Sequence, residues 1–210
     1  WEAIDQDEYK QAVNLVEAAR QANVQHIITS GLPNTSAFDI EQTQIEDYIR
    51  ALPQDSTFPY ITFIQMGFYY QNFLTFFPPG SANVEFRYPI FSPAARIPIY
   101  DLRDTGKIVR ECFLDPKKWG NSQRVPIVAE QLTIEEICTI IQQVTRKNVH
   151  FVPLTYEQAL RKLHRETVNI LKWYNDIGSA DDQQAAKTNE IWPKMRKFVD
   201  WIKETQWLVE

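Results

Sequence analysis

The chain has 210 residues, of which 44% are hydrophobic, and its formal net charge is −5. This length and composition predict one soluble α/β unit with a substantial core, which excludes a disordered protein. Binding of nucleic acid needs clustered Lys and Arg, so the acidic balance argues against a direct nucleic-acid partner.

A helix and a strand are expected first. Apolar residues between Asp7 and about Ala22 recur at helical spacing, and an apolar strand from Val24 to Ser30 follows directly. A dinucleotide-binding half begins instead with a strand, a glycine-rich turn and a helix. The six glycines, at 31, 67, 80, 106, 120 and 178, stand too far apart for that turn. The chain therefore encodes no loop of the kind that holds a pyrophosphate.

Two apolar strands end at a glycine, the first at Ser30-Gly31 and the second at Met66-Gly67. Ligands of open α/β sheets usually lie at the carboxyl ends of parallel strands, so both ends are candidates for a binding cleft. The alternative is two buried parallel strands that simply close in tight turns. The helix between them is amphipathic and carries on one face Ile45, Tyr48, Ile49 and Leu52.

An aromatic segment, GFYYQNFLTFF, follows the second strand. Its glycine lets the backbone approach a ligand closely, and an aromatic ring can cover a flat heterocycle. The alternative is a short helix packed into the core through Phe68, Phe73, Phe76 and Phe77. Both interpretations can hold for different residues of the segment.

The prolines and aromatic residues between positions 78 and 98 mark the expected start of a second subdomain. A short strand is expected at 97–100, and Asp101 or Asp104 can cap the helix that follows. Two carboxylates at this spacing also suit acid–base chemistry or a metal. No histidine lies nearby, and we expect a capping role.

The later part of the chain predicts more strands and helices. Strands are expected at 124–129 and at 148–152. Thr133 with Glu136, and Thr155 with Gln158, have the spacing of capping boxes at helix starts.

The tail, 191–210, has the pattern of an amphipathic helix that contains three tryptophans. We expect this helix to dock on its own domain. The alternative is a surface for a protein partner, in which the indole rings are the buried anchors.

Cysteines and histidines form no recognisable chemical site. Cys112 and Cys138 fall on apolar helical patterns, which predicts buried free thiols and no disulfide. His26, His150 and His164 lie in separate elements without ligand spacing, so we expect no metal. The first ten residues have neither the basic start nor the apolar core of a signal sequence, and no apolar run reaches about 18 residues. We therefore expect a cytoplasmic protein without membrane association, with the nucleus as an alternative location.

In chain order the characteristic segments are SGLPN, a helix with IEDYIR, GFYYQNFL, PIYDLRDTGKIVRECFLDP and LTIEEI. This order resembles the NmrA-like family of atypical short-chain dehydrogenase/reductases, from Trp1 to the final WIKE. The resemblance implies an α/β fold, in which the later strands of a Rossmann-like parallel sheet are joined to a smaller, mainly helical C-terminal subdomain.

The resemblance also implies a division of the chain. Residues 1–66 belong to the dinucleotide-binding domain and residues 67–210 to a substrate or partner subdomain, with a strand near 124–129 returning to the sheet. In this family the glycine-rich loop lies before the stretch that the opening Trp-Glu resembles. We therefore expect a fragment that lacks the pyrophosphate-binding half.

The cofactor implied by the resemblance is NAD(P), preferably NADP; the residue that distinguishes the two lies upstream. Without the upstream loop, binding to this chain is expected to be weak or absent. The residues expected to border the cofactor are Ser30, Gly31, Leu32, Gln42, Met66, Gly67, Phe68, Tyr69 and Tyr70.

Gln42 falls where the family has its reactive lysine, and a glutamine cannot carry that charge. The sequence has no lysine between Lys10 and Lys107 and no YxxxK motif. Well-placed acid–base groups contribute about 10²–10⁴-fold to a rate, so their loss should abolish most hydride transfer. The alternative is that Gln42 is an ordinary polar residue on the exposed side of its helix.

The resulting prediction is an NAD(P)-binding redox sensor or regulator that acts through a protein partner or a homodimer, without dehydrogenase turnover. The first alternative is an NADP-dependent reductase of a small carbonyl or quinone, with Tyr69 or Tyr70 as proton donor. The second is a structural subunit that has lost nucleotide binding.

Overall fold

The computed structural model describes residues 8–31, 41–53, 58–76, 83–88, 94–163, 165–173, 175 and 183–206. Contacts divide the chain into two compact units. Unit 1 is Trp1–Met66 with Lys107–Pro126, and unit 2 is Gly67–Gly106 with Ile127–Glu210. Within the described ranges, no helix has the length and apolar character needed to span a bilayer.

Unit 1 is a three-stranded sheet between helices. Its elements are α1 (Glu8–Gln21), β1 (His26–Gly31), α2 (Glu41–Arg50), β2 (Tyr60–Met66), most of α4 (Thr105–Leu114), α5 (Pro116–Trp119) and most of β6 (Asn121–Ile127). The strand order is β1-β2-β6, and β1 runs parallel to β2, in a register from His26 opposite Tyr60 to Gly31 opposite Gln65. The expected α/β class with a parallel sheet is confirmed.

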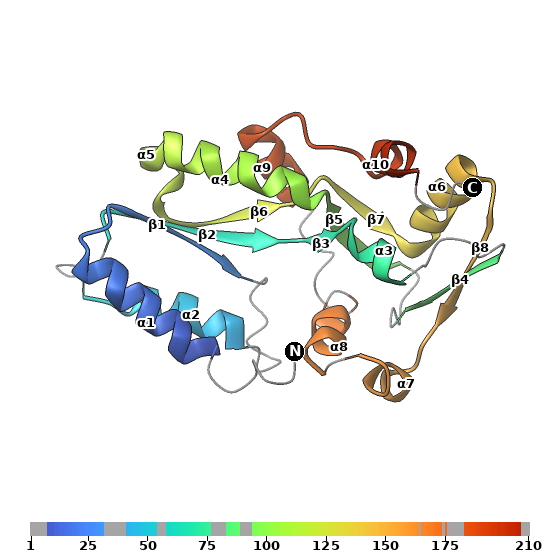
Figure 1. Ribbon diagram of the computed structural model, residues 1–210, viewed down its shortest axis with the longest axis horizontal. Helices are drawn as coiled ribbons and strands as arrows, with labels where there is room; N and C mark the ends of the chain where they lie inside the picture. The colour runs from blue at the N-terminus through green and yellow to red at the C-terminus, as the bar shows by residue number, and fades with distance from the viewer. Residues whose placement is uncertain are drawn as a thin grey trace. The chain divides into compact units, whose positions relative to one another are not determined.

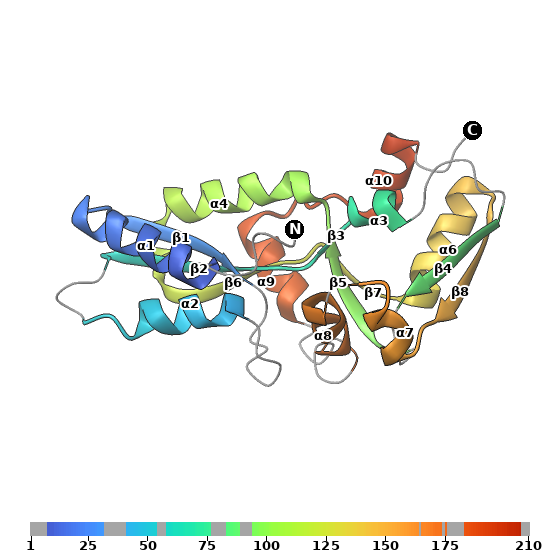
Figure 2. The same ribbon diagram turned by 60° about the horizontal axis from the view of Figure 1, so that its bottom comes forward.

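Helices cover both faces of this sheet. Figures 1 and 2 show α1 and α2 on one side of β1 and β2, and α4 on the other. Alternation along β2 explains the packing, because Ile61 and Phe63 belong to the same core cluster as Val16 of α1 and Ile49 of α2. The two helices are also joined through Tyr48, whose hydroxyl donates to Glu17 at 2.6 Å.

Unit 2 contains two small sheets and most of the helices. Its strands are β3 (Phe68–Tyr69), β4 (Asn83–Tyr88), β5 (Arg96–Tyr100), β7 (Glu130–Thr133) and β8 (Asn148–Pro153). β5 lies between β3, which is parallel to it, and β7, which is antiparallel; β4 pairs with β8 in parallel. The helices are α3 (Asn72–Phe76), the 3-10 turn η3 (Leu102–Asp104), α6 (Ile134–Thr145), α7 (Tyr156–Leu160), α8 (Arg165–Trp173), α9 (Gln183–Ile191) and α10 (Phe198–Thr205).

The local predictions agree with these elements. Both capping boxes are present, at the starts of α6 and α7. Asp101 accepts a hydrogen bond from the backbone of Arg103 and so caps the 3-10 turn η3, which precedes the helix α4 that it was expected to cap. Cys112 and Cys138 are free and buried, and burial raises the pKa of each thiol to about 11.

The C-terminal aromatic helix, α10, is docked on its own unit, as expected. Phe198 and Ile202 have no exposed surface, and Trp201 is 1% exposed. Phe198 packs against Tyr70 and Phe73 at ring-centroid distances of 5.1 and 5.0 Å. Phe198, Trp201 and Ile202 therefore belong to the core of unit 2, whereas Trp192 precedes α10 and Trp207 lies outside the described residues.

Candidate functional site

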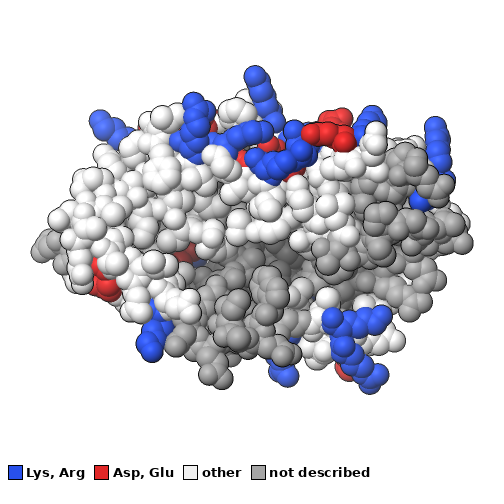
Figure 3. All heavy atoms as spheres, in the orientation of Figure 1, with Lys and Arg blue, Asp and Glu red and all other residues white. Residues whose placement is uncertain are grey.

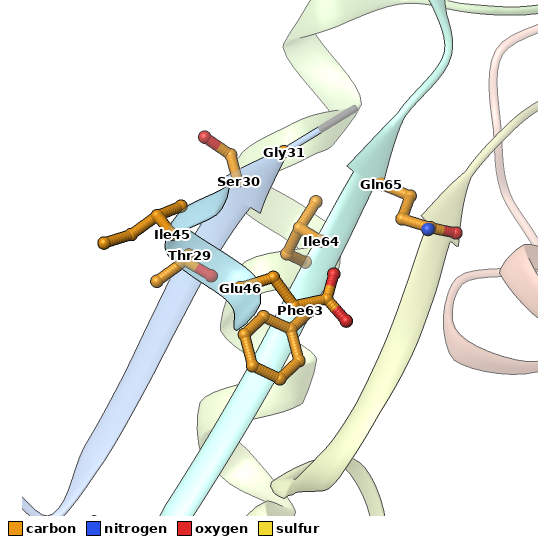
Figure 4. Close-up of a pocket in the computed structure, with 8 residues that line it drawn as sticks. All are labelled: Thr29, Ser30, Gly31, Ile45, Glu46, Phe63, Ile64 and Gln65. Carbon is orange, nitrogen blue, oxygen red and sulfur yellow. The ribbon is translucent and has the colours of Figure 1, made fainter. Parts of the chain in front are cut away.

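A small depression lies at the carboxyl ends of β1 and β2 in unit 1. Together with the open solvent at its mouth it measures about 220 Å³, and its lining residues are Thr29, Ser30, Gly31, Ile45, Glu46, Phe63, Ile64 and Gln65. Figure 4 shows Ile45 and Glu46 of α2 beside the ends of the two strands, with the Glu46 carboxylate directed toward β2. The depression combines strand-end polar groups with an apolar wall.

Glu46 is held in place by two arginines. Its carboxylate accepts from Arg50 Nε at 2.8 Å and from Arg124 Nε at 2.9 Å, and its side chain is only 13% exposed. Arg50 in turn lies over the ring of Phe63, 4.4 Å from its centroid, and donates to the carbonyl of Ser122. This network ties α2 to β2 and β6, so it fixes one wall of the depression.

Of the predicted site residues of unit 1, Ser30 and Gly31 line this depression. Ser30 is exposed and Gly31 half-buried at the end of β1, and Met66 is half-buried at the end of β2. Gln42 lies in the first turn of α2 by its backbone, and Leu32 lies outside the described residues.

Sequence reasoning did not select Ile45 and Glu46 as site residues. A signal for them existed, since they follow Gln42 by three and four positions and so share its helix face. That spacing predicts Ile45 and Glu46 as site residues only if Gln42 is first taken as one.

Gly67 is required by the packing of unit 2 itself. A Cβ added there would lie 2.7 Å from the carbonyl oxygen of Pro98 and 3.1 Å from that of Ile127. The Gly67 amide also donates to the Ile127 carbonyl at 3.2 Å. The close approach that glycine permits at this position is therefore between backbone segments of the protein.

The next two aromatic residues are half-buried. Phe68 meets Phe73 edge-on at 5.6 Å between ring centroids, and Tyr69 meets Tyr100 edge-on at 5.3 Å. Burial raises the pKa of the Tyr69 phenol, an effect that its hydrogen bond with Tyr100 opposes in part. Both rings keep some exposed surface, which a flat ligand needs for contact.

Tyr70 was expected to cover a nicotinamide, but it is too deeply buried to do so. Its side chain has no exposed surface, and its hydroxyl lies 3.2 Å from Glu130 Oε2 and 3.1 Å from the Arg196 carbonyl oxygen. Burial, then the charge of Glu130 and the hydrogen bond to it, raise the pKa of Tyr70 far above its ordinary value. A buried phenol held in this way is a core residue and a poor proton donor.

A second polar cluster surrounds Asp101 in unit 2. Its fully buried carboxylate accepts from Gln71 Nε2 at 2.8 Å, from Arg103 through backbone and side chain, and from Arg196 at 2.7 Å. Burial raises the pKa of Asp101, but these hydrogen bonds outweigh burial and hold it well below its usual range. Both arginines also pair with Glu204, and Figure 3 likewise shows acidic side chains beside basic ones on the face it presents.

The depression is small and open to solvent, and it offers groups of two kinds for contact with a ligand. The exposed Ser30 hydroxyl and the strand-end backbone supply polar contacts, and Ile45 and Phe63 supply an apolar wall. Among the residues that the structure places, no cluster of His, Cys, Asp and Glu suits a metal ion.

Comparison with known proteins gives one family. The sequence model of the NmrA-like family matches residues 3–202. An NmrA-like family domain-containing oxidoreductase of Aspergillus hancockii is 28% identical over 165 residues, which are 70% of this chain and 49% of that protein. The nitrogen metabolite repression protein of Neurospora crassa is 28% identical over 160 residues, 70% of this chain and 32% of that protein. The chain thus spans half or less of the length of these two relatives.

Solved structures share the fold. NmrA, a negative transcriptional regulator in complex with NAD, superposes with a TM-score of 0.73 at 21% identity, over 95% of this chain and 70% of that one. An NADPH-dependent quinone oxidoreductase from Escherichia coli, complexed with NADPH, gives 0.70 at 13% identity, over 96% and 73%. At these identities the likeness shows a common Rossmann-like architecture.

Proposed function

The chain belongs to the NmrA-like family, and from this premise we propose that it binds NAD(P) as a redox sensor and acts through protein partners without dehydrogenase turnover. The observation that carries the proposal is the depression at the ends of β1 and β2, whose described lining contains no lysine or tyrosine. A site of this kind can hold a nucleotide without offering it a lysine or tyrosine for catalysis.

The cofactor contacts in this proposal combine strand ends and aromatic rings. Ser30, Gly31 and Leu32 border the nucleotide at the end of β1, and Gln42 stands in the place of the family's lysine. Met66, Gly67, Phe68 and Tyr69 line the nicotinamide end. When bound, NAD(P) supplies a hydride-carrying ring; the chain's own residues orient that ring and exclude water from it.

The charge arrangement supports binding without turnover. Glu46, the ionisable group among the described lining residues, is committed to Arg50 and Arg124 and is no free base. Tyr70 is buried with a strongly raised pKa, which opposes a role as proton donor. In this proposal residues 1–66, with the strand near 124–129 that returns to their sheet, form the nucleotide-binding part, and the rest of residues 67–210 forms the partner-binding part.

Calorimetric titration of NADPH, NADP and NADH tests the proposal. The titrations use the 210-residue chain and, where the gene encodes residues before Trp1, a chain that includes them. Binding to the longer chain, with no consumption of NADPH in the presence of a quinone, is the expected result. Loss of binding in the 210-residue chain would place the phosphate contacts upstream.

Two other results would contradict the proposal in different ways. Oxidation of NADPH by a quinone would favour the reductase alternative, with the half-buried Tyr69 as the remaining candidate donor. The oxidoreductase name of the Aspergillus relative gives this alternative some support. Absence of binding in both chains would favour a structural subunit.

A further inference from the structure

The segment Arg196–Phe198, here called the strap, leads into α10 and is fixed to unit 2 by backbone hydrogen bonds. The Arg196 amide donates to Asp104 Oδ2 at 2.9 Å, and the Phe198 amide donates to Glu130 Oε2 at 2.6 Å. The side chain of Lys197 donates to the Ala129 carbonyl at 2.9 Å. The strap is therefore held at two places in the unit, at Asp104 of η3 and at the neighbouring residues Ala129 and Glu130.

Tyr70 joins the strap to the aromatic turn Gly67–Tyr70. A phenol has one proton to donate, and the Tyr70 hydroxyl lies at nearly equal distances from Glu130 Oε2 and the Arg196 carbonyl oxygen, 3.2 and 3.1 Å. The same Glu130 oxygen accepts from the first amide of α10. The turn and the helix consequently share one carboxylate oxygen.

Contacts between aromatic rings join the same two segments as these hydrogen bonds. Tyr70 packs on Phe198 and on Trp201, with centroids 5.1 and 5.7 Å apart, and Phe198 stacks on Trp201 at an interplanar angle of 12°. Phe73 touches both Phe68 of the turn and Phe198 of the helix. Close-packed interiors transmit a displacement of one ring to its neighbours.

We propose that Tyr70 is a positioning residue which, through Glu130 and the strap, makes the aromatic turn and α10 move as one element. This inference rests on the proposed function: a nucleotide that contacts Phe68 and Tyr69 would change the order of α10, and a protein bound over α10 would change the nucleotide end in return. The sensor would then report cofactor binding at its C-terminal helix.

The connection between the aromatic turn and α10 through Tyr70 and Glu130 is here called the joint. Hydrogen–deuterium exchange of the nucleotide-free chain tests whether it exists. Tyr70→Phe keeps the ring and removes the shared proton, and the amides of α10 should then exchange about tenfold faster, because the variant loses a hydrogen bond to the carboxylate that holds the first amide of α10. The matched control is Tyr156→Phe, which removes a hydroxyl that donates to Asn169 at 3.0 Å between α7 and α8. If Tyr70→Phe does not fold, Glu130→Gln takes its place.

The outcomes of this first comparison are decisive. Faster exchange of α10 in Tyr70→Phe and wild-type exchange in Tyr156→Phe support the joint. Unchanged α10 amides in Tyr70→Phe overturn it, and so does equal acceleration in both variants, because that would reflect general loosening of unit 2.

The second comparison uses the longer chain with saturating NADPH. The wild-type protein should show protection of α10 on binding, and Tyr70→Phe should lose that protection. If NADPH binds to the wild type without changing the amide exchange of α10, the proposed coupling between the nucleotide and α10 is wrong. If NADPH does not bind at all, the proposed function fails, and the nucleotide-free comparison still decides whether the joint exists.

Discussion

At the scale of single residues, position 67 needs a glycine because the backbone packs closely there within unit 2. Gly67→Ala would bring a Cβ within 2.7 Å of a backbone oxygen that cannot move without shifting β5. We expect the substitution to lower the free energy of unfolding by about 1–3 kcal/mol, measured by urea denaturation.

The control for this prediction is the other glycine of unit 2 with known surroundings, Gly106. It lies in α4, and a Cβ added there meets nothing within 4 Å. Gly106→Ala should therefore stabilise the protein by about 0.4–1 kcal/mol. Equal losses in both variants would show that the Pro98 contact is not the cause.

His26 gives a pH-dependent prediction. Its Nε2 lies 2.9 Å from the Thr62 hydroxyl, its Nδ1 is buried, and burial lowers its pKa below the ordinary 6.5. The unfolded chain takes up the proton at a higher pH than the folded chain, so stability falls as pH drops below about 6.5.

Urea denaturation between pH 8 and pH 5 measures this effect in the wild type and in His26→Gln, which cannot take up the proton. The stability difference between the two proteins should be constant above pH 7 and should shift in favour of the variant at pH 5. A difference that does not change with pH would exclude His26 as the cause.

At the scale of elements, the Asp101 cluster connects the end of β5 to Gln71, which precedes α3, and to the strap. Asp101→Asn removes the charge that two arginines share, and we expect a loss of about 2–4 kcal/mol in the free energy of unfolding. The folded pKa lies below the unfolded value near 3.8. The loss should therefore be constant from pH 5 to 8 and shrink only as pH falls below about 3.8.

Glu204 provides the matched control, because it pairs with the same two arginines but its side chain is 49% exposed. Glu204→Gln should cost no more than about 1 kcal/mol, as exposed ion pairs do. If Glu204→Gln lowered the free energy of unfolding as much as Asp101→Asn, burial would not explain why the buried carboxylate contributes more.

At the scale of the whole molecule, unit 1 is assembled from two stretches of chain. Residues 1–66 alone would lack β6 and α4, which complete the sheet and cover one face of it. Nucleotide binding at the ends of β1 and β2 would therefore depend on the returning segment 107–126, which supplies Arg124 to Glu46.

Thermal unfolding with NADPH is the prediction at this scale. At 100 times its Kd, NADPH should stabilise the longer chain by about 2.7 kcal/mol, a rise in Tm of roughly 5–10 °C, because it binds only the folded protein. The 210-residue chain should show a much smaller rise. An equal rise in both chains would place all the phosphate contacts within the 210 residues.

The sequence by itself determined the features that depend on near neighbours. The capping boxes of Thr133 and Thr155 need only a partner three residues away, and the amphipathic pattern of α2 needs only its own period. Apolar strands ended by glycine, with the order of motifs along the chain, were enough for the α/β class and the family.

Only the tertiary structure decided which particular side chains are buried and which partners they bind. Tyr70 reads as a ligand-facing aromatic in its segment, but its partners Glu130 and Arg196 lie 60 and 126 residues away and place it in the core. Gly67 likewise contacts Pro98 and Ile127. The physical reason is that helix and strand periods are local, whereas burial and hydrogen-bond partners depend on which distant segments meet.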